Sequence, residues 1–208
     1  MSHDPLIARW SAWLVRAGLH DENDRHRHEL FRCYLDPSRH YHNLDHIASC
    51  FVELDGAPDP GASRPAIKAA IWYHDCIYDP RRSDNEVCSA EVAAKALAEM
   101  GAQKEFTQAT ARLILATRHA AVPVMQDEQL LCDIDLSILG KPPEVFAAYE
   151  REIRQEYAHV SDEAFRAGRA AVLRRFLSRP HIYCTRNFRD RYEAPARRNL
   201  QDSLCRLI

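Results

Sequence analysis

Three segments of this chain carry histidine and aspartate among apolar residues, and these side-chain types bind metal ions or transfer protons. The first segment is residues 39–46, with the sequence RHYHNLDH. His42 and His46 are four residues apart, so in a helix they would share one face. Two imidazoles at this spacing can bind one ion, or one can bind it while the other does acid–base work. A polar helix start with exposed histidines explains the segment equally well.

The second segment is residues 72–78, with the sequence WYHDCIY, which places His74 and Asp75 between aromatic and aliphatic residues. Ile67, Ile71 and His74 follow one another at helical spacing, and this predicts that His74 points inward with the apolar face. A buried imidazole and a buried carboxylate are costly unless both are paired, and one bound cation pairs both. The context therefore indicates a metal site more strongly than the His-Asp pair alone.

The third segment is residues 130–140, with the sequence LLCDIDLSILG, in which two carboxylates interrupt an apolar run. Buried carboxylates are rare unless they are paired or bound to metal. Asp133 and Asp135 are two residues apart, so in a helix they cannot face the same point, and one should be buried while the other lies nearer solvent. A capping or turn role fits Asp133 better than Asp135.

One His from the first segment, the His-Asp pair of the second and one Asp from the third would together supply two imidazoles and two carboxylates on separate helices. Such a nitrogen and oxygen set suits Mn, Fe, Zn, Co or Mg ions and does not choose among them. The lack of a thiolate argues against a structural zinc site. Four ligands would leave positions of a six-coordinate ion open to water and substrate, as metal-assisted hydrolysis requires.

The order His, His-Asp, Asp over residues 38–140 resembles the HD-domain superfamily of metal-dependent phosphohydrolases. Residues 40–47, 74–80, 84–86 and 135–140 are similar to a subgroup of small bacterial proteins described as predicted HD phosphohydrolases. The resemblance implies an all-α fold and a divalent metal ion bound by His46, His74, Asp75 and Asp135. It also implies hydrolysis of a small phosphorylated substrate such as a nucleotide.

Residues 41–48 further resemble the Tyr-His-Asn-x-x-His-Ala motif of cyclic nucleotide phosphodiesterases, which belong to the same superfamily. This resemblance implies that His42 is the general acid and His46 the ligand, and that Asp75 takes part in catalysis by bridging to a second ion if one binds. Residues 135–137 match that family's last ligand segment, which favours Asp135 over Asp133. The chain departs from the motif after Asp75, where the phosphodiesterases carry a further histidine, and this argues against cyclic nucleotides as substrate.

Five further residues are candidates to support the site or to contact substrate, and each has a structural alternative. His119 would follow a helix C-terminus, where the helix dipole favours an imidazolium. Glu86 fits a capping box that begins at residue 83, and Asp79 fits a turn. Arg39 could bind a phosphate or lie on a solvated surface. The fifth candidate is Asp133.

Two other functions compete with the hydrolase. A di-iron oxygenase of the HD type would need two more histidines between Asp75 and Asp135, and the chain has only His119 there. A non-catalytic module that binds metal or nucleotide would also carry these residues, although an intact ligand set argues against a degenerate site.

Apolar periodicity predicts helices almost everywhere and no strand pattern longer than four or five residues. We therefore expect one all-α domain over residues 1–208, with a metal-site core at about 38–140 and a C-terminal helical extension at about 141–208. The expected helices span about 4–17, 22–35, 43–54, 65–78, 84–100, 104–119, 126–139, 143–158, 162–178 and 190–206.

Composition excludes several classes of protein. The 208 residues include 28 Lys and Arg against 30 Asp and Glu, a net charge of −2, which argues against a nucleic-acid partner bound by bulk charge. The sequence shows no apolar run of about 20 residues, so no membrane contact is expected. The seven cysteines form no C-x-x-C pair, which predicts reduced thiols in a cytoplasmic protein. Cys50, Cys88 and Cys132 lie among apolar neighbours, as core cysteines do. The sequence does not predict an oligomeric state.

Overall fold

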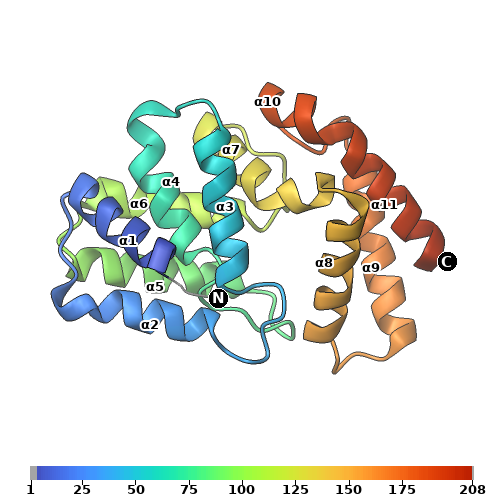
Figure 1. The fold of residues 1–208 in the computed structure, drawn as a ribbon, viewed down its shortest axis with the longest axis horizontal. Helices are drawn as coiled ribbons and strands as arrows, with labels where there is room; N and C mark the ends of the chain where they lie inside the picture. The colour runs from blue at the N-terminus through green and yellow to red at the C-terminus, as the bar shows by residue number, and fades with distance from the viewer. Residues whose placement is uncertain (1–3, 208) are drawn as a thin grey trace. The chain divides into compact units, whose positions relative to one another are not determined.

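Helices form all of the regular structure in residues 4–207, which are the residues that the computed structural model describes (Figure 1). The predicted all-α class is therefore confirmed. The chain separates into two compact units, one ending at Ala121 and the other beginning at Val122. The expectation of one domain with an extension from about residue 141 stays a prediction.

The first unit is built around α4, which contacts four other helices of the unit, namely α1, α3, α5 and α6. Residues 69–73 of α4 are buried on every side, and a helix that is apolar all round needs neighbours all round. The Trp72 ring packs against Trp10 and Phe51, with ring centroids 5.4 and 4.6 Å apart. The helices of this unit are α1 (Asp4–Ala17), α2 (Arg25–Tyr34), α3 (Leu44–Gly56), α4 (Arg64–Tyr73), α5 (Asn85–Glu99) and α6 (Lys104–Ala116), with short 3-10 helices at Glu22–Asp24 and Gly61–Ser63.

The start of α3 is set by its cap. The Asn43 side chain accepts hydrogen bonds from the backbone N–H groups of Asp45 and His46, at 2.8 and 3.3 Å. This pairs two donors that the first turn would otherwise leave unpaired. His42 consequently precedes the helix, and the prediction that His42 and His46 share one helix face is wrong.

The end of α4 comes at Tyr73, several residues before the predicted end at residue 78. His74 is the C-cap, and its N–H still donates to the Ala70 carbonyl at 2.8 Å. A continuing helix would need an N–H from Pro80, which proline lacks. The Arg39 guanidinium instead donates to the carbonyls of Asp75 and Cys76, at 2.5 and 2.9 Å. His74 and Asp75 therefore lie where the helix gives way to a turn.

In the second unit α8 and α9 follow one another as a helical hairpin, and the C-terminal helix α11 packs against α9. Helix α11 contacts α9 and the 3-10 helix at Leu136–Gly140. Gly140 lies so close to Tyr192 that an added Cβ would stand 2.6 Å from the Tyr192 Cβ. The helices are α7 (Gln126–Asp135), α8 (Pro143–Glu156), α9 (Asp162–Leu177), α10 (Arg186–Phe188) and α11 (Ala194–Leu207), with a π-helical turn at Arg189–Glu193. The last helical segment thus begins at Arg186, earlier than the predicted residue 190.

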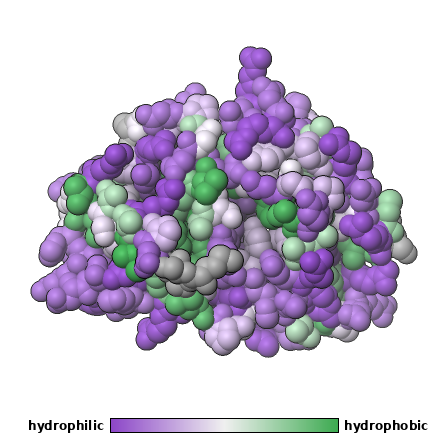
Figure 2. All heavy atoms as spheres, viewed as in Figure 1, coloured by the Kyte–Doolittle hydropathy of each residue, from purple (hydrophilic) through white to green (hydrophobic). Residues whose placement is uncertain are grey.

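Hydrophilic residues cover most of the face seen in Figure 2, with small hydrophobic groups between them. Among the described residues, none of the helices combines the length and the apolar character needed to cross a membrane.

Candidate metal centre

Two helices of the first unit bring the candidate ligands together. His46 lies in the first turn of α3 with 5% of its surface exposed, and His74 caps α4 with 1% exposed. Their Nε2 atoms are 3.1 Å apart. The Asp75 Oδ2 atom lies 3.0 Å from the His74 Nε2 and 3.6 Å from the His46 Nε2. Two imidazole nitrogens and one carboxylate oxygen therefore converge at one buried point.

The His74 ring is held in one orientation by its other nitrogen. Nδ1 lies 3.1 Å from the Ile71 carbonyl oxygen, which can only accept, so Nδ1 carries the proton. In a neutral ring this leaves the Nε2 lone pair directed at His46 and Asp75. A backbone partner on the distal nitrogen is the usual support of a metal-bound histidine.

The charge of Asp75 suits a cation at this point. Burial by itself would raise the pKa of Asp75, but the positive charge of protonated His74, which then also donates a hydrogen bond from Nε2, and the charges of His42 and His46 hold that pKa well below its usual range. A neutral imidazole nitrogen and a carboxylate oxygen are both acceptors, so at 3.0 Å they repel unless a proton or a metal ion lies between them.

The spacing of these atoms fits a single ion. With bonds of about 2.1 Å, two ligand atoms lie about 3.0 Å apart at right angles and about 3.4 Å apart in a tetrahedron. The observed separations are 3.0, 3.1 and 3.6 Å. The separations between the ligand atoms of His46, His74 and Asp75 are thus close to the edge lengths of a coordination polyhedron.

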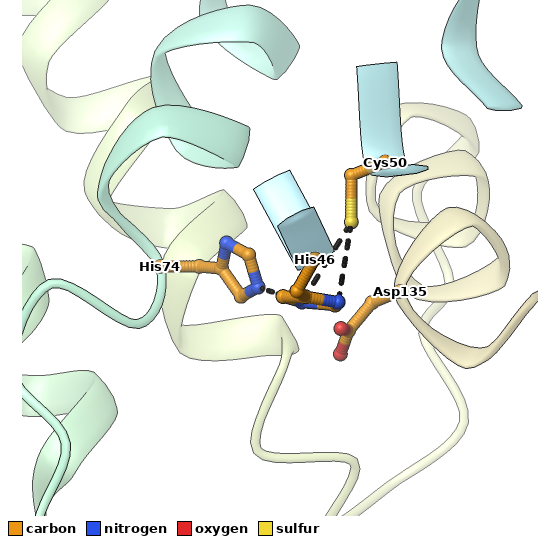
Figure 3. Close-up of side chains that lie close together, drawn as sticks. All are labelled: His46, Cys50, His74 and Asp135. Carbon is orange, nitrogen blue, oxygen red and sulfur yellow. Dashed lines mark hydrogen bonds between the residues drawn. The ribbon is translucent and has the colours of Figure 1, made fainter. Parts of the chain in front are cut away.

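Cys50 is a fourth member of this cluster that sequence reasoning placed only in the core. Its Sγ lies 3.7 Å from Nε2 and 3.9 Å from Nδ1 of His46 (Figure 3). Ligand atoms of His46, Cys50 and His74 all lie within 4.8 Å of one another, so this group could hold a metal ion. The signal was available in the sequence, because Cys50 follows His46 by four residues and shares its helix face.

His42 lies beside the cluster in the segment that precedes α3. Its ring stacks on Tyr78 at a centroid distance of 4.0 Å, and its centroid is 6.0 Å from that of His46. The side chain is half-buried. Aromatic packing therefore fixes the His42 imidazole next to the candidate ligands.

Arg39 holds the two histidine segments together. Its guanidinium donates to the carbonyls of His42, Asp75 and Cys76, at 3.3, 2.5 and 2.9 Å. It also lies over the Tyr34 ring, 5.3 Å from the centroid. These contacts cross from residue 39 to residues 75 and 76, and they make Arg39 a support for the turn that carries the ligands.

The other supporting candidates of the first unit have structural partners. The Asp79 carboxylate accepts the Arg81 N–H at 2.9 Å, as a turn residue does. Glu86 forms an ion pair with Arg118 at 3.9 Å. The N-cap of α5 is Asp84 and not residue 83, and its side chain makes no capping bond, so the capping-box prediction is wrong. His119 follows α6 with a φ of 51°, in the left-handed conformation common after helix ends.

Asp133 and Asp135 belong to the second unit and differ as the spacing predicted, since Asp133 is fully buried and Asp135 is half-buried. Asp133 accepts hydrogen bonds from the Cys184 N–H, the Thr185 N–H and the Thr185 hydroxyl, each at 2.7 Å. It anchors the start of α10, and its role in supporting the site stays a prediction. Figure 3 also draws Asp135, the last residue of α7, whose role as a ligand stays a prediction.

Comparison of the chain with protein-family models, with curated proteins and with solved structures found no match.

Proposed function

We propose that this protein is a metal-dependent phosphohydrolase that cleaves a nucleotide or another small phosphate ester. The observation that carries the proposal is the convergence of the His46 Nε2, the His74 Nε2 and the Asp75 Oδ2 within 3.6 Å of one another. The resemblance of residues 38–140 to the HD-domain superfamily supports the reaction class. The same resemblance implies that Asp135 is a ligand.

Each of these residues would have a separate role in hydrolysis. A divalent ion, when bound, polarises a phosphoryl oxygen and acidifies water. His46 and His74 would hold the ion through Nε2, and Asp75 would supply negative charge and orient the nucleophile. His42 would hold a proton for the departing oxygen, and its stacking on Tyr78 keeps the imidazole oriented.

Metal content is the first test. Mass spectrometry of the purified protein should find stoichiometric divalent metal in the wild type and in Asp202→Asn, an exposed control, and little in Asp75→Asn. Metal at 100 times its dissociation constant should also stabilise the wild type by about 2.7 kcal/mol. A wild type that takes up no metal under any loading condition would refute the proposal.

Turnover is the second test. Cleavage of a panel of nucleotides and phosphate esters should require metal. His42→Ala should keep the metal and lose roughly 10²–10⁴-fold in kcat. Stoichiometric metal without cleavage of any ester would instead favour the non-catalytic module, and metal-dependent oxygen consumption would favour the oxygenase.

A further inference from the structure

We propose that Cys50 is a thiolate ligand of the metal centre and that the resident ion is accordingly a thiophilic one, zinc, cobalt or iron(II), and not magnesium. This inference rests on the metal site of the proposed function and specifies which class of ion that site takes. It concerns side chains of the first unit alone.

The position of Cys50 is the first argument. It lies one helical turn after His46 on α3, and only 2% of its surface is exposed. A thiolate at about 2.3 Å and an imidazole at about 2.1 Å from one ion in a tetrahedron lie about 3.6 Å apart. The Cys50 Sγ lies 3.7 Å from the His46 Nε2, close to this separation, and 3.9 Å from the His46 Nδ1, so a rotation of the thiol would bring it onto an ion held at Nε2 (Figure 3).

The makeup of the cluster is the second argument. With Cys50 the first unit offers two imidazoles and one thiolate whose ligand atoms lie within 4.8 Å of one another, and the Asp75 Oδ2 lies 3.0 Å from the His74 Nε2. Three such ligands leave a position of a zinc-like ion open to water. Magnesium demands oxygen ligands and octahedral geometry, whereas thiolate and imidazole ligands suit zinc, cobalt and iron.

Ligation changes the protonation of the thiol and nothing else. The ion displaces the Cys50 proton, a metal–sulfur bond forms, and the proton passes to water. The step involves no oxidation and no further reactant.

Cobalt(II) is the probe, because a cobalt–thiolate bond gives a charge-transfer band in the near ultraviolet. Metal-free wild type titrated with cobalt(II) should show this band at one equivalent. Cys50→Ser should lose the band, whereas Cys132→Ser should keep it. Cys132 is a matched control, since it is also 2% exposed. Far-ultraviolet circular dichroism of each variant checks that the helices remain.

Comparing the affinities for different ions separates the loss of a ligand from a general loss of structure. Cys50→Ser should lower zinc affinity by more than the roughly 10–100-fold that loss of a supporting group costs. Its manganese and magnesium affinities should change much less. A general loosening of the site would weaken all ions together and would overturn the assignment.

The outcomes separate the two proposals. Stoichiometric cobalt with no charge-transfer band in the wild type would overturn the thiolate and leave the metal centre standing. No cobalt binding at all would overturn both. A band that survives in Cys50→Ser would assign the sulfur to another cysteine and overturn the inference.

Discussion

Replacing Arg39 is the sharpest test of how this site is built. The guanidinium donates to the carbonyls of Asp75 and Cys76, at 2.5 and 2.9 Å, and to that of His42 at 3.3 Å. Arg39→Ala removes all three donors at once. The turn after α4 then loses the contacts that hold Asp75 in place, so both stability and metal binding should fall.

The magnitude follows from the hydrogen bonds. A bond from a charged donor contributes about 1.5–3 kcal/mol, and the lower figure applies because Arg39 is half-buried and water can reach the freed carbonyls. The two shorter bonds together give about 3 kcal/mol of lost unfolding free energy. Metal affinity should fall roughly 10–100-fold, as it does when a group that orients a ligand is removed.

Chemical unfolding of the metal-free protein and metal titration measure the two effects separately. Arg81→Ala is the control, because the Arg81 side chain is 67% exposed, and it should behave as wild type. Arg39→Lys should recover only part of the loss, since one ammonium cannot serve three carbonyls. If Arg39→Ala bound metal normally and raised only the KM for a phosphate ester, the side chain would contact substrate and the reasoning would be refuted.

Four further substitutions test the fold and the charge of the site. Gly140→Ala should destabilise the protein by about 1–3 kcal/mol in thermal unfolding, because the new Cβ would lie 2.6 Å from the Tyr192 Cβ. In the same assay Gly168→Ala on α9 should stabilise the protein by roughly 0.5–1 kcal/mol, because its Cβ meets nothing within 4 Å. Asp133→Ala should cost about 3–5 kcal/mol in the same assay, because it leaves three donors without their acceptor, and a change below about 1 kcal/mol would contradict the anchoring role. The pKa of Asp75 is lowered in the folded protein from its usual 3.8, so the ionised carboxylate stabilises the metal-free fold above pH 3.8. This stability is lost as the pH falls below about 4. Asp75→Asn should therefore make the unfolding free energy depend less on pH between about pH 6 and about pH 3.

Local pattern was sufficient for most of the helical structure. The expected helices are present, and several end within a residue or two of their predicted bounds, as at α5 and α9. Periodicity and turn residues act over a few positions, so a single sequence carries them. The errors fall where a distant group intervenes, as at the end of α4, where Arg39 takes the carbonyls that a longer helix would use.

The sequence by itself determined the all-α class and marked His46, His74 and Asp75, because polar residues within apolar helical faces need a partner whatever the topology. Only the tertiary structure decided that His46 meets His74, that Arg39 supports the ligand turn and that Asp133 anchors α10. The Arg39 and Asp133 contacts join residues 36 to 52 positions apart, and no local preference encodes which distant donor meets which acceptor. Packing of the helices makes that choice, because each buried polar group must find its partner in the folded chain.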